Sequence, residues 1–250
     1  MMGLRNVYRV FRETRSVARQ EASLAVTGDS PRAAEIAARL GAQRDVKGAE
    51  IILAASGDTL TLSGKAVEEP GEISLPSVDE RTLLDELVPQ IVHALDEDYL
   101  VPLAKGCPPF RRAVCEELIR KNARQNAVVG ALPIPGADMP VMTANQARMV
   151  LTIAAAHGEN LSLDRARELL GVLAAGFGLR TLARQGVKLV PVGGWAVAAA
   201  IGYAGTVAMG RATMLYFERG KQRLGETEIA EIRQHATEEA RDFVSRLRRR

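Results

Sequence analysis

The N-terminal half of the chain alternates short apolar runs with a helical repeat of apolar positions. Residues 23–26 and 51–54 are apolar runs of strand length, and between them an apolar repeat with helical spacing ends at Leu40. Ser30 followed by Pro31 marks the start of that helix, because serine caps helices and proline fits the first helical turn. The pattern therefore predicts a βαβ unit.

Two further elements are expected in the same half. Residues 72–76, "EISLP", predict a third short strand, and residues 79–95 predict a helix. With the βαβ unit, these elements form a small, mostly parallel sheet.

The pattern is helical from about residue 108 to 217. One helix is expected to reach residue 129, and the sequence Pro133–Ile134–Pro135–Gly136 ends it because proline removes a backbone donor and restricts the preceding residue. A second helix follows this break, and residues 161–185 predict another amphipathic helix. The fold class expected for the whole chain is α+β, mainly α, with a helical C-terminal domain preceded by a small α/β unit.

Asp138 lies just beyond the proline-rich break. A short carboxylate at this position can accept hydrogen bonds from the free N–H groups of the following helix, so we expect Asp138 to be a cap. A contact with an ion or a partner is the second interpretation.

Residues 189–210 contain no charged side chain and are long enough to cross the hydrocarbon core of a bilayer, about 30 Å, as a helix. Alanine, glycine and valine dominate the run, and Pro191, Gly193 and Gly194 interrupt its start. The run is therefore a candidate membrane segment, in which we single out Leu189, Trp195, Gly202 and Gly210. A tightly packed soluble helix and a helix lying in the membrane surface are the alternatives.

The charge of the chain is uneven. The net charge is +3, but residues 1–20 carry five arginines and one glutamate, and residues 241–250 carry five arginines and one aspartate. Each end is therefore +4, and the middle of the chain is −5. Residues 1–20 are expected to form a basic amphipathic helix. Such ends suit an anionic membrane surface or an acidic partner better than nucleic acid, and solvated helix ends are the simpler interpretation.

The glycine turn after the first strand is the place where a phosphate-binding loop would lie. That motif needs glycine, lysine and a hydroxyl residue at the fifth to seventh positions after its first glycine. Counting from Gly28, those positions hold Ala33, Ala34 and Glu35. The other lysine-containing turn, at Gly64, lacks the first glycine and the hydroxyl. We expect no nucleotide binding, no cofactor and no enzymatic activity.

Cysteine and histidine do not form a metal-ligand pattern. Cys107 and Cys115 are the two cysteines, and no secretory signal is expected in residues 1–20, so a reducing compartment follows. The three histidines are expected on helix surfaces or at helix ends: His93, His157 and His235.

Three segments together resemble the YcjF-like domain of unknown function, which follows Era-like GTPase domains in bacteria. They are "LPIPGADMPVMTANQARMVLTIAAAHG", "AAGFGLRTLARQ" and "VPVGGWAVAAAIGYAGTVAMGRATMLYFERG". The main positions that carry the resemblance, for which we expect a structural role, are Pro133, Pro135, Gly136, Asp138, Gln146, Arg180, Pro191, Gly194, Trp195 and Gly210; Met149, Gly158, Gly176, Thr206 and Phe217 also match.

The resemblance implies membrane association and no known catalytic residue. It also implies that residues 21–104 are a shortened GTPase-like remnant, because about 80 residues cannot hold a GTPase domain of roughly 160. The expected division of the chain is a basic helix at 1–20, this remnant at 21–104, the YcjF-like domain at 105–220 and a C-terminal helix with a basic tail at 221–250.

The function expected from the sequence is that of a non-enzymatic, membrane-associated adaptor or scaffold. It would act on the cytoplasmic side of the inner membrane, with a protein partner that could be a GTPase or a second copy, and with an anionic membrane surface. A soluble, cytoplasmic helical interaction protein is the alternative, and an active GTPase is third.

Overall fold

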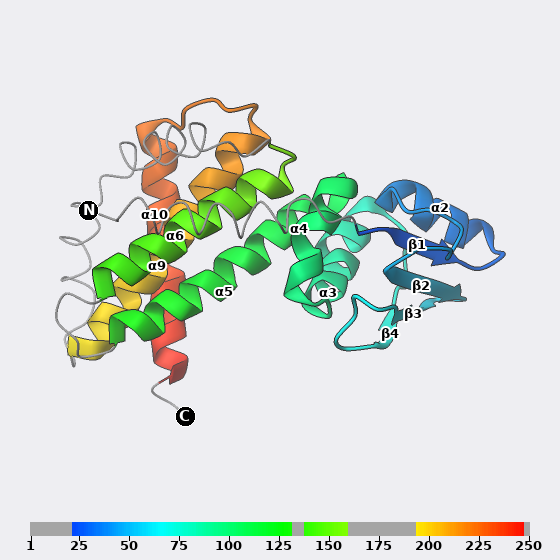
Figure 1. Ribbon diagram of the computed structural model, residues 1–250, viewed down its shortest axis with the longest axis horizontal. Helices are drawn as coiled ribbons and strands as arrows, with labels where there is room; N and C mark the ends of the chain where they lie inside the picture. The colour runs from blue at the N-terminus through cyan, green and yellow to red at the C-terminus, as the bar shows by residue number, and fades with distance from the viewer. Residues whose placement is uncertain (1–21, 132–137, 160–193, 248–250) are drawn as a thin grey trace. The chain divides into compact units, whose positions relative to one another are not determined.

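The structure is a computed structural model that describes residues 22–131, 138–159 and 194–247. The chain divides into two compact units (Figure 1). Of the described residues, the sheet unit comprises 22–117 and 155–159, and the bundle unit comprises 118–131, 138–154 and 194–247. The predicted class, α+β and mainly α, is confirmed.

The sheet unit contains a four-stranded sheet in the order β1-β2-β3-β4. Its strands are β1 (Leu24–Thr27), β2 (Ile51–Ser56), β3 (Thr59–Ser63) and β4 (Gly71–Ser74). Strands β1 and β2 are parallel, whereas β2–β3 and β3–β4 are antiparallel pairs.

The prediction of a mostly parallel sheet is therefore wrong. Strand β3, which the sequence analysis missed, follows β2 after the two residues Gly57 and Asp58. Gly57 has φ 58, and a glycine with positive φ at the first position of a two-residue turn is typical of a β-hairpin. So short a connection can only join antiparallel strands.

The predicted βαβ unit is confirmed. Helix α2 (Pro31–Leu40) begins where the sequence predicted, with the Ser30 hydroxyl accepting a hydrogen bond from the N–H of Ala33 at 3.2 Å. It ends at Gly41, whose φ of 68 is readily adopted by glycine. The helix buries Ala33, Ile36, Ala37 and Leu40, a spacing that places all four side chains on one face.

The rest of the sheet unit is helical. A π-helix, η1 (Thr82–Leu87), continues directly into α3 (Val88–His93), so the helix predicted at residues 79–95 exists but begins with a wider turn. Helix α4 (Glu97–Gly106), which was not predicted, is capped by Asp96. A 3₁₀ turn, η2 (Pro108–Phe110), follows it.

The described residues beyond position 110 form four long helices, three in the region predicted to be helical and one at the predicted C-terminal helix. They are α5 (Arg111–Ala131), α6 (Asp138–Ala156), α9 (Gly194–Glu218) and α10 (Glu226–Leu247). Helix α5 begins in the sheet unit, and from Leu118 onward it belongs to the bundle unit. Helix α9 is the most deeply buried of the four, with fifteen buried residues that include alanines and glycines on several sides.

Helices α5 and α9 run antiparallel and in close contact. Along the pair, Gly130 lies against Ala198, Asn126 against Gly202, and Ile119 against Gly210. Helix α6 runs parallel to α9, because Met142 contacts Gly202 while Gln146 hydrogen-bonds Thr206.

The burial of α9 bears on the candidate membrane segment. The described part of that segment, residues 194–210, supplies core residues of the bundle, including Ala199, Ala200, Val207 and Ala208. In the part of the chain that the structure describes, no helix has the length and apolar character needed to cross a membrane.

Candidate functional site

The β1–α2 junction, where the sequence was tested for a phosphate loop, is short and internally bonded. Strand β1 ends at Thr27 and α2 begins at Pro31, so three residues make the connection. The phosphate-binding motif places four residues between its two glycines before the helix, but here the fifth residue after Gly28 is Ala33, already in the first turn of α2. The Ser30 hydroxyl binds the N–H of Ala33.

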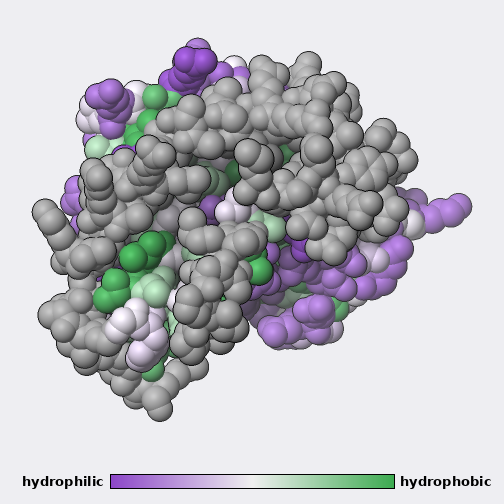
Figure 2. Space-filling view, turned by 60° about the vertical axis from the view of Figure 1, so that its left-hand side comes forward, coloured by the Kyte–Doolittle hydropathy of each residue, from purple (hydrophilic) through white to green (hydrophobic). Residues whose placement is uncertain are grey.

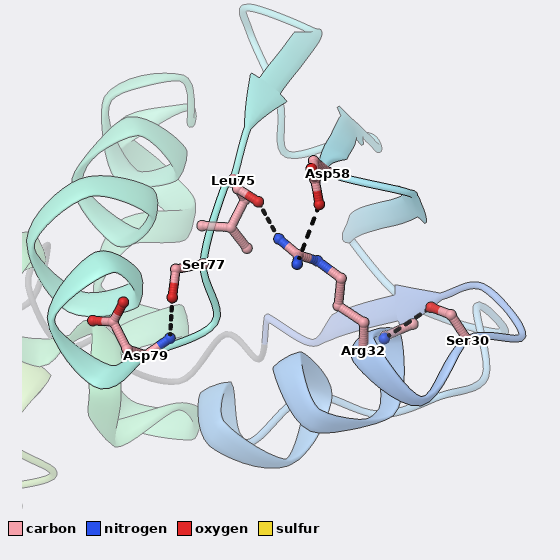
Figure 3. A network of polar contacts seen from close by, with 7 residues as sticks. Ser30, Arg32, Asp58, Leu75, Ser77 and Asp79 are labelled. Carbon is pink, nitrogen blue, oxygen red and sulfur yellow. Dashed lines mark hydrogen bonds and ion pairs between the residues drawn. The ribbon is translucent and has the colours of Figure 1, made fainter.

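Arg32 links the start of α2 to the far strands of the sheet (Figure 3). Its Nη1 lies 3.3 Å from Oδ1 of Asp58, in the β2–β3 turn, and its Nη2 donates to the carbonyl oxygen of Leu75, just after β4. The guanidinium group of Arg32 therefore binds two other segments of the sheet unit.

Gly28 is also closely surrounded. Its φ is 124, and a Cβ atom there would lie 2.8 Å from the carbonyl oxygen of Ala55 on β2. Its own carbonyl oxygen accepts a hydrogen bond from Arg44. The loop thus lies tightly against β2, and a larger residue at position 28 would clash with that strand.

Lys65, in the second turn that was tested, pairs with a carboxylate. Its Nζ lies 3.1 Å from Oε1 of Glu50, whose other oxygen accepts a hydrogen bond from the Ser23 hydroxyl at 2.8 Å. Burial alone would raise the pKa of Glu50, but the hydrogen bonds from Ser23 and Lys65 lower it overall. The Glu50 carboxylate, acting by hydrogen bond and by charge, raises the pKa of Lys65.

The sheet unit has a pocket of ≈ 250 Å³ between α2 and the π-helix. Leu40, Leu83, Leu84 and Pro109 make its apolar lining, and Arg39 and Glu80 supply the charges. Arg39 is already bound to Glu35, with Nη2 and Oε1 2.9 Å apart. Among the described residues, the lining contains no cysteine, serine or histidine.

A polar cluster crosses the centre of the bundle unit. The side-chain amide of Asn126 on α5 donates to the Thr206 hydroxyl on α9 at 2.9 Å, and Asn145 on α6 donates to the Asn126 oxygen at 2.9 Å. Thr206 donates in turn to the carbonyl oxygen of Gly202 at 2.8 Å, and Gln146 approaches it at 3.5 Å. Asn126 and Thr206 are fully buried, so their bonds hold three helices in one register.

One end of the bundle unit exposes large apolar side chains. Trp195 on α9 is 52% exposed, Val128 on α5 is 62% exposed and Val141 on α6 is 46% exposed. The helix contacts place the two valines level with residues 200 and 201 of α9, within about 9 Å of Trp195 along the helix axis. We call these three residues the apolar end. Figure 2 turns the bundle side towards the viewer and shows hydrophobic surface there, in green, among grey atoms.

A cysteine–histidine contact was not predicted, because the two residues are 42 positions apart. Sγ of the buried Cys115 on α5 lies 3.9 Å from Nε2 of His157, which follows the last residue of α6. Burial and the charge of Arg111 lower the pKa of His157, against the opposing effect of Glu159. The imidazole is therefore neutral at pH 7. His93, at the end of α3, and His235, on α10, are exposed as expected.

The predicted site residues fall into two groups. Asp138 is the first residue of α6, Gln146 joins the polar cluster, Gly194 and Trp195 begin α9, and Gly202 and Gly210 lie against α5. The others lie outside the described residues: Pro133, Pro135, Gly136, Arg180, Leu189 and Pro191. Within residues 22–131, 138–159 and 194–247, no group of three or more acidic, histidine or cysteine side chains could hold a metal ion.

Comparison with known proteins places the bundle unit's helices in a family. A family model described as "Domain of unknown function (DUF697)" matches residues 103–242, which include α5, α6, α9 and most of α10. No curated protein and no solved structure matches the chain. Because the match covers more than half of its 250 residues, the chain belongs to the DUF697 family.

Proposed function

We propose that this chain is a non-catalytic scaffold that works at the surface of a membrane and does not bind nucleotide itself. The observation that carries the proposal is the apolar end of the bundle unit, where Trp195, Val128 and Val141 expose about half or more of their surface. Tryptophan is enriched at membrane–water interfaces because its ring is apolar and its N–H can still bond to headgroups or water.

The contacts at the β1–α2 junction support the part of the proposal that concerns nucleotide. Ser30 and Arg32 are engaged within the fold, and the three-residue connection is shorter than the motif requires. The side chain at the position of the phosphate-binding lysine is that of Ala34. An active GTPase is therefore the weakest of the three functions considered.

The proposed setting follows from the resemblance to YcjF-like domains and from the basic ends. The scaffold would lie on the cytoplasmic side of the inner membrane of a bacterium and contact anionic lipid and a protein partner. A GTPase that carries the motifs missing here, or a second copy of the chain, are the partners proposed. Nucleic acid is not among them, since the basic residues lie at the ends and few aromatic residues accompany them.

A helical interaction protein that works away from membranes is the second candidate. The burial of α9 within the bundle favours it, because the small residues of that helix then serve helix packing. In this case the apolar end would contact another protein. The two candidates use the same surface, so lipid binding separates them.

Co-flotation of the full chain with vesicles tests the proposal. Wild-type protein should float with vesicles that contain phosphatidylglycerol, and Val128→Ser/Trp195→Ser should float poorly. A matched control, Val46→Ser/Leu84→Ser, removes two exposed apolar side chains of the sheet unit and should behave like wild type. Wild-type protein that stays at the bottom of the gradient at low salt would leave the second candidate.

A further inference from the structure

A group of arginines on the bundle unit is not explained by the proposed scaffold role. Arg120 and Arg124 lie on α5, and Arg246 lies on α10. All three side chains are exposed. Their charges act on one aromatic residue of α9, Tyr203, whose ring stacks on Phe243 of α10 with the centroids 4.6 Å apart.

The helix geometry brings the three arginines to one place. Arg120 and Arg124 are four residues apart and therefore lie on the same side of α5. The contact between Asn126 and Gly202 sets α5 beside α9 at the level of Tyr203. Arg246 is three residues beyond Phe243, so it lies on the side of α10 that carries the stacked ring.

The charges act on a common point. Burial raises the pKa of the Tyr203 hydroxyl, and Glu239 adds to this effect, whereas Arg124, Arg120 and Arg246 oppose it. The phenol therefore stays protonated at pH 7 and can donate a hydrogen bond. All three guanidinium groups are therefore near enough to the Tyr203 hydroxyl for their charges to act on it.

The acidic residues near these arginines form no ion pair with them among the described residues. The Glu239 carboxylate, which acts on Tyr203, forms an ion pair with Arg211, whose Nη1 lies 2.6 Å from Oε1 of Glu239. Arg246 donates from Nε to the backbone oxygen of Asp242 at 3.3 Å, and the Asp242 carboxylate is exposed. Glu116 and Glu117 lie four and three residues before Arg120 on α5. Among the described residues, no carboxylate lies within ion-pair distance of Arg120, Arg124 or Arg246.

We infer that Arg120, Arg124 and Arg246, with the Tyr203 hydroxyl, form a binding site for a phosphate group. Guanidinium groups bind phosphate through paired N–H donors, and three of them match the several oxygens of a phosphate better than the two of a single carboxylate. The phosphate could belong to a lipid headgroup or to a soluble phosphate ester, because the chemistry recognised is the same. The inference does not depend on the scaffold role.

The test uses the full chain and two triple variants. Arg120→Gln/Arg124→Gln/Arg246→Gln removes the site, and Arg112→Gln/Arg223→Gln/Arg241→Gln removes the same charge from three exposed arginines elsewhere. Inorganic phosphate is titrated while the NMR signals of the arginine side chains are followed. Vesicles of phosphatidylglycerol and of phosphatidylcholine are then compared by sedimentation.

Phosphate should shift the arginine signals of wild type and of the control variant, and the site variant should lose these shifts. If the phosphate comes from lipid, binding to phosphatidylglycerol vesicles should fall on the order of 100-fold in the site variant, since each cation near an anionic surface contributes about a five-fold factor. If phosphate shifts the arginine signals but the protein does not bind vesicles, the ligand is a soluble phosphate ester. That result would contradict the membrane-surface scaffold and support the phosphate site. Equal losses in both triple variants, or unchanged phosphate shifts in the site variant, would overturn the site.

Discussion

Two glycines of α9 lie where α5 is too close for a side chain, and they differ in what blocks the space. A Cβ atom at Gly202 would lie 2.5 Å from the backbone oxygen of Asn126, whereas one at Gly210 would lie 2.5 Å from Cγ1 of Ile119. A side chain can adopt another rotamer, but a backbone oxygen inside a helix moves only if the two helices separate. Alanine should therefore be tolerated better at Gly210 than at Gly202.

The expected magnitudes follow from two opposing effects. Alanine favours a helix by about 1 kcal/mol relative to glycine, and overpacking a core costs about 1–3 kcal/mol. For Gly202→Ala the overpacking cost is at the upper end of that range, because the backbone of α5 must move. After the gain in helix propensity, we expect a net loss of about 1–2 kcal/mol in the free energy of unfolding. Gly210→Ala should change it by less than about 1 kcal/mol. Gly194→Ala is the control, since nothing lies within 4 Å of a Cβ atom there.

Urea unfolding followed by the fluorescence of Trp195, the one tryptophan of the chain, reports on the bundle unit. The dependence of the free energy on urea should be unchanged, so that differences in midpoint measure stability. The reasoning is refuted if Gly202→Ala is as stable as Gly194→Ala, or if Gly210→Ala is the less stable of the two packed variants.

Three other predictions concern single side chains. Thr206→Val removes the acceptor for the buried Asn126 amide and should cost about 1–3 kcal/mol in urea unfolding, part of which Asn126→Leu/Thr206→Val should restore. Ser30→Ala should cost the sheet unit about 1 kcal/mol of stability, by circular dichroism, as the loss of a helix cap. Hydrogen bonds from Ser77 and Thr82 lower the pKa of Asp79, so its contribution is present above the ordinary pKa of about 4 and is lost as the pH falls further. The stability difference between wild type and Asp79→Asn should therefore shrink below about pH 4, and a difference that grows there would contradict the assignment.

Local signals explain which parts of the fold could be predicted. Helix α2 was placed correctly because its cap, its first-turn proline and its apolar spacing lie within a few residues of one another. Strand β3 was missed although Leu60 and Leu62 alternate with polar residues, a strand pattern. Its antiparallel direction depends on the Gly57–Asp58 turn, which was not recognised as a hairpin signal.

Long-range contacts account for the rest. Asn126 and Thr206 are 80 residues apart, and Cys115 and His157 are 42 apart, so no spacing rule could have joined them. The resemblance identified Gln146 as a position of structural role. Only the structure shows that role, a hydrogen bond from Gln146 to Thr206. The arginines around Tyr203 come from α5 and α10, and neither helix alone marks a site.

The membrane-surface scaffold is tested most directly by the emission of Trp195 when vesicles are added. The ring is half exposed in the apolar end, so docking of that end should shift its emission to shorter wavelength and allow quenching by brominated lipid in vesicles that contain phosphatidylglycerol. Emission that stays unchanged and unquenched while the protein is saturated with these vesicles would contradict docking through the apolar end.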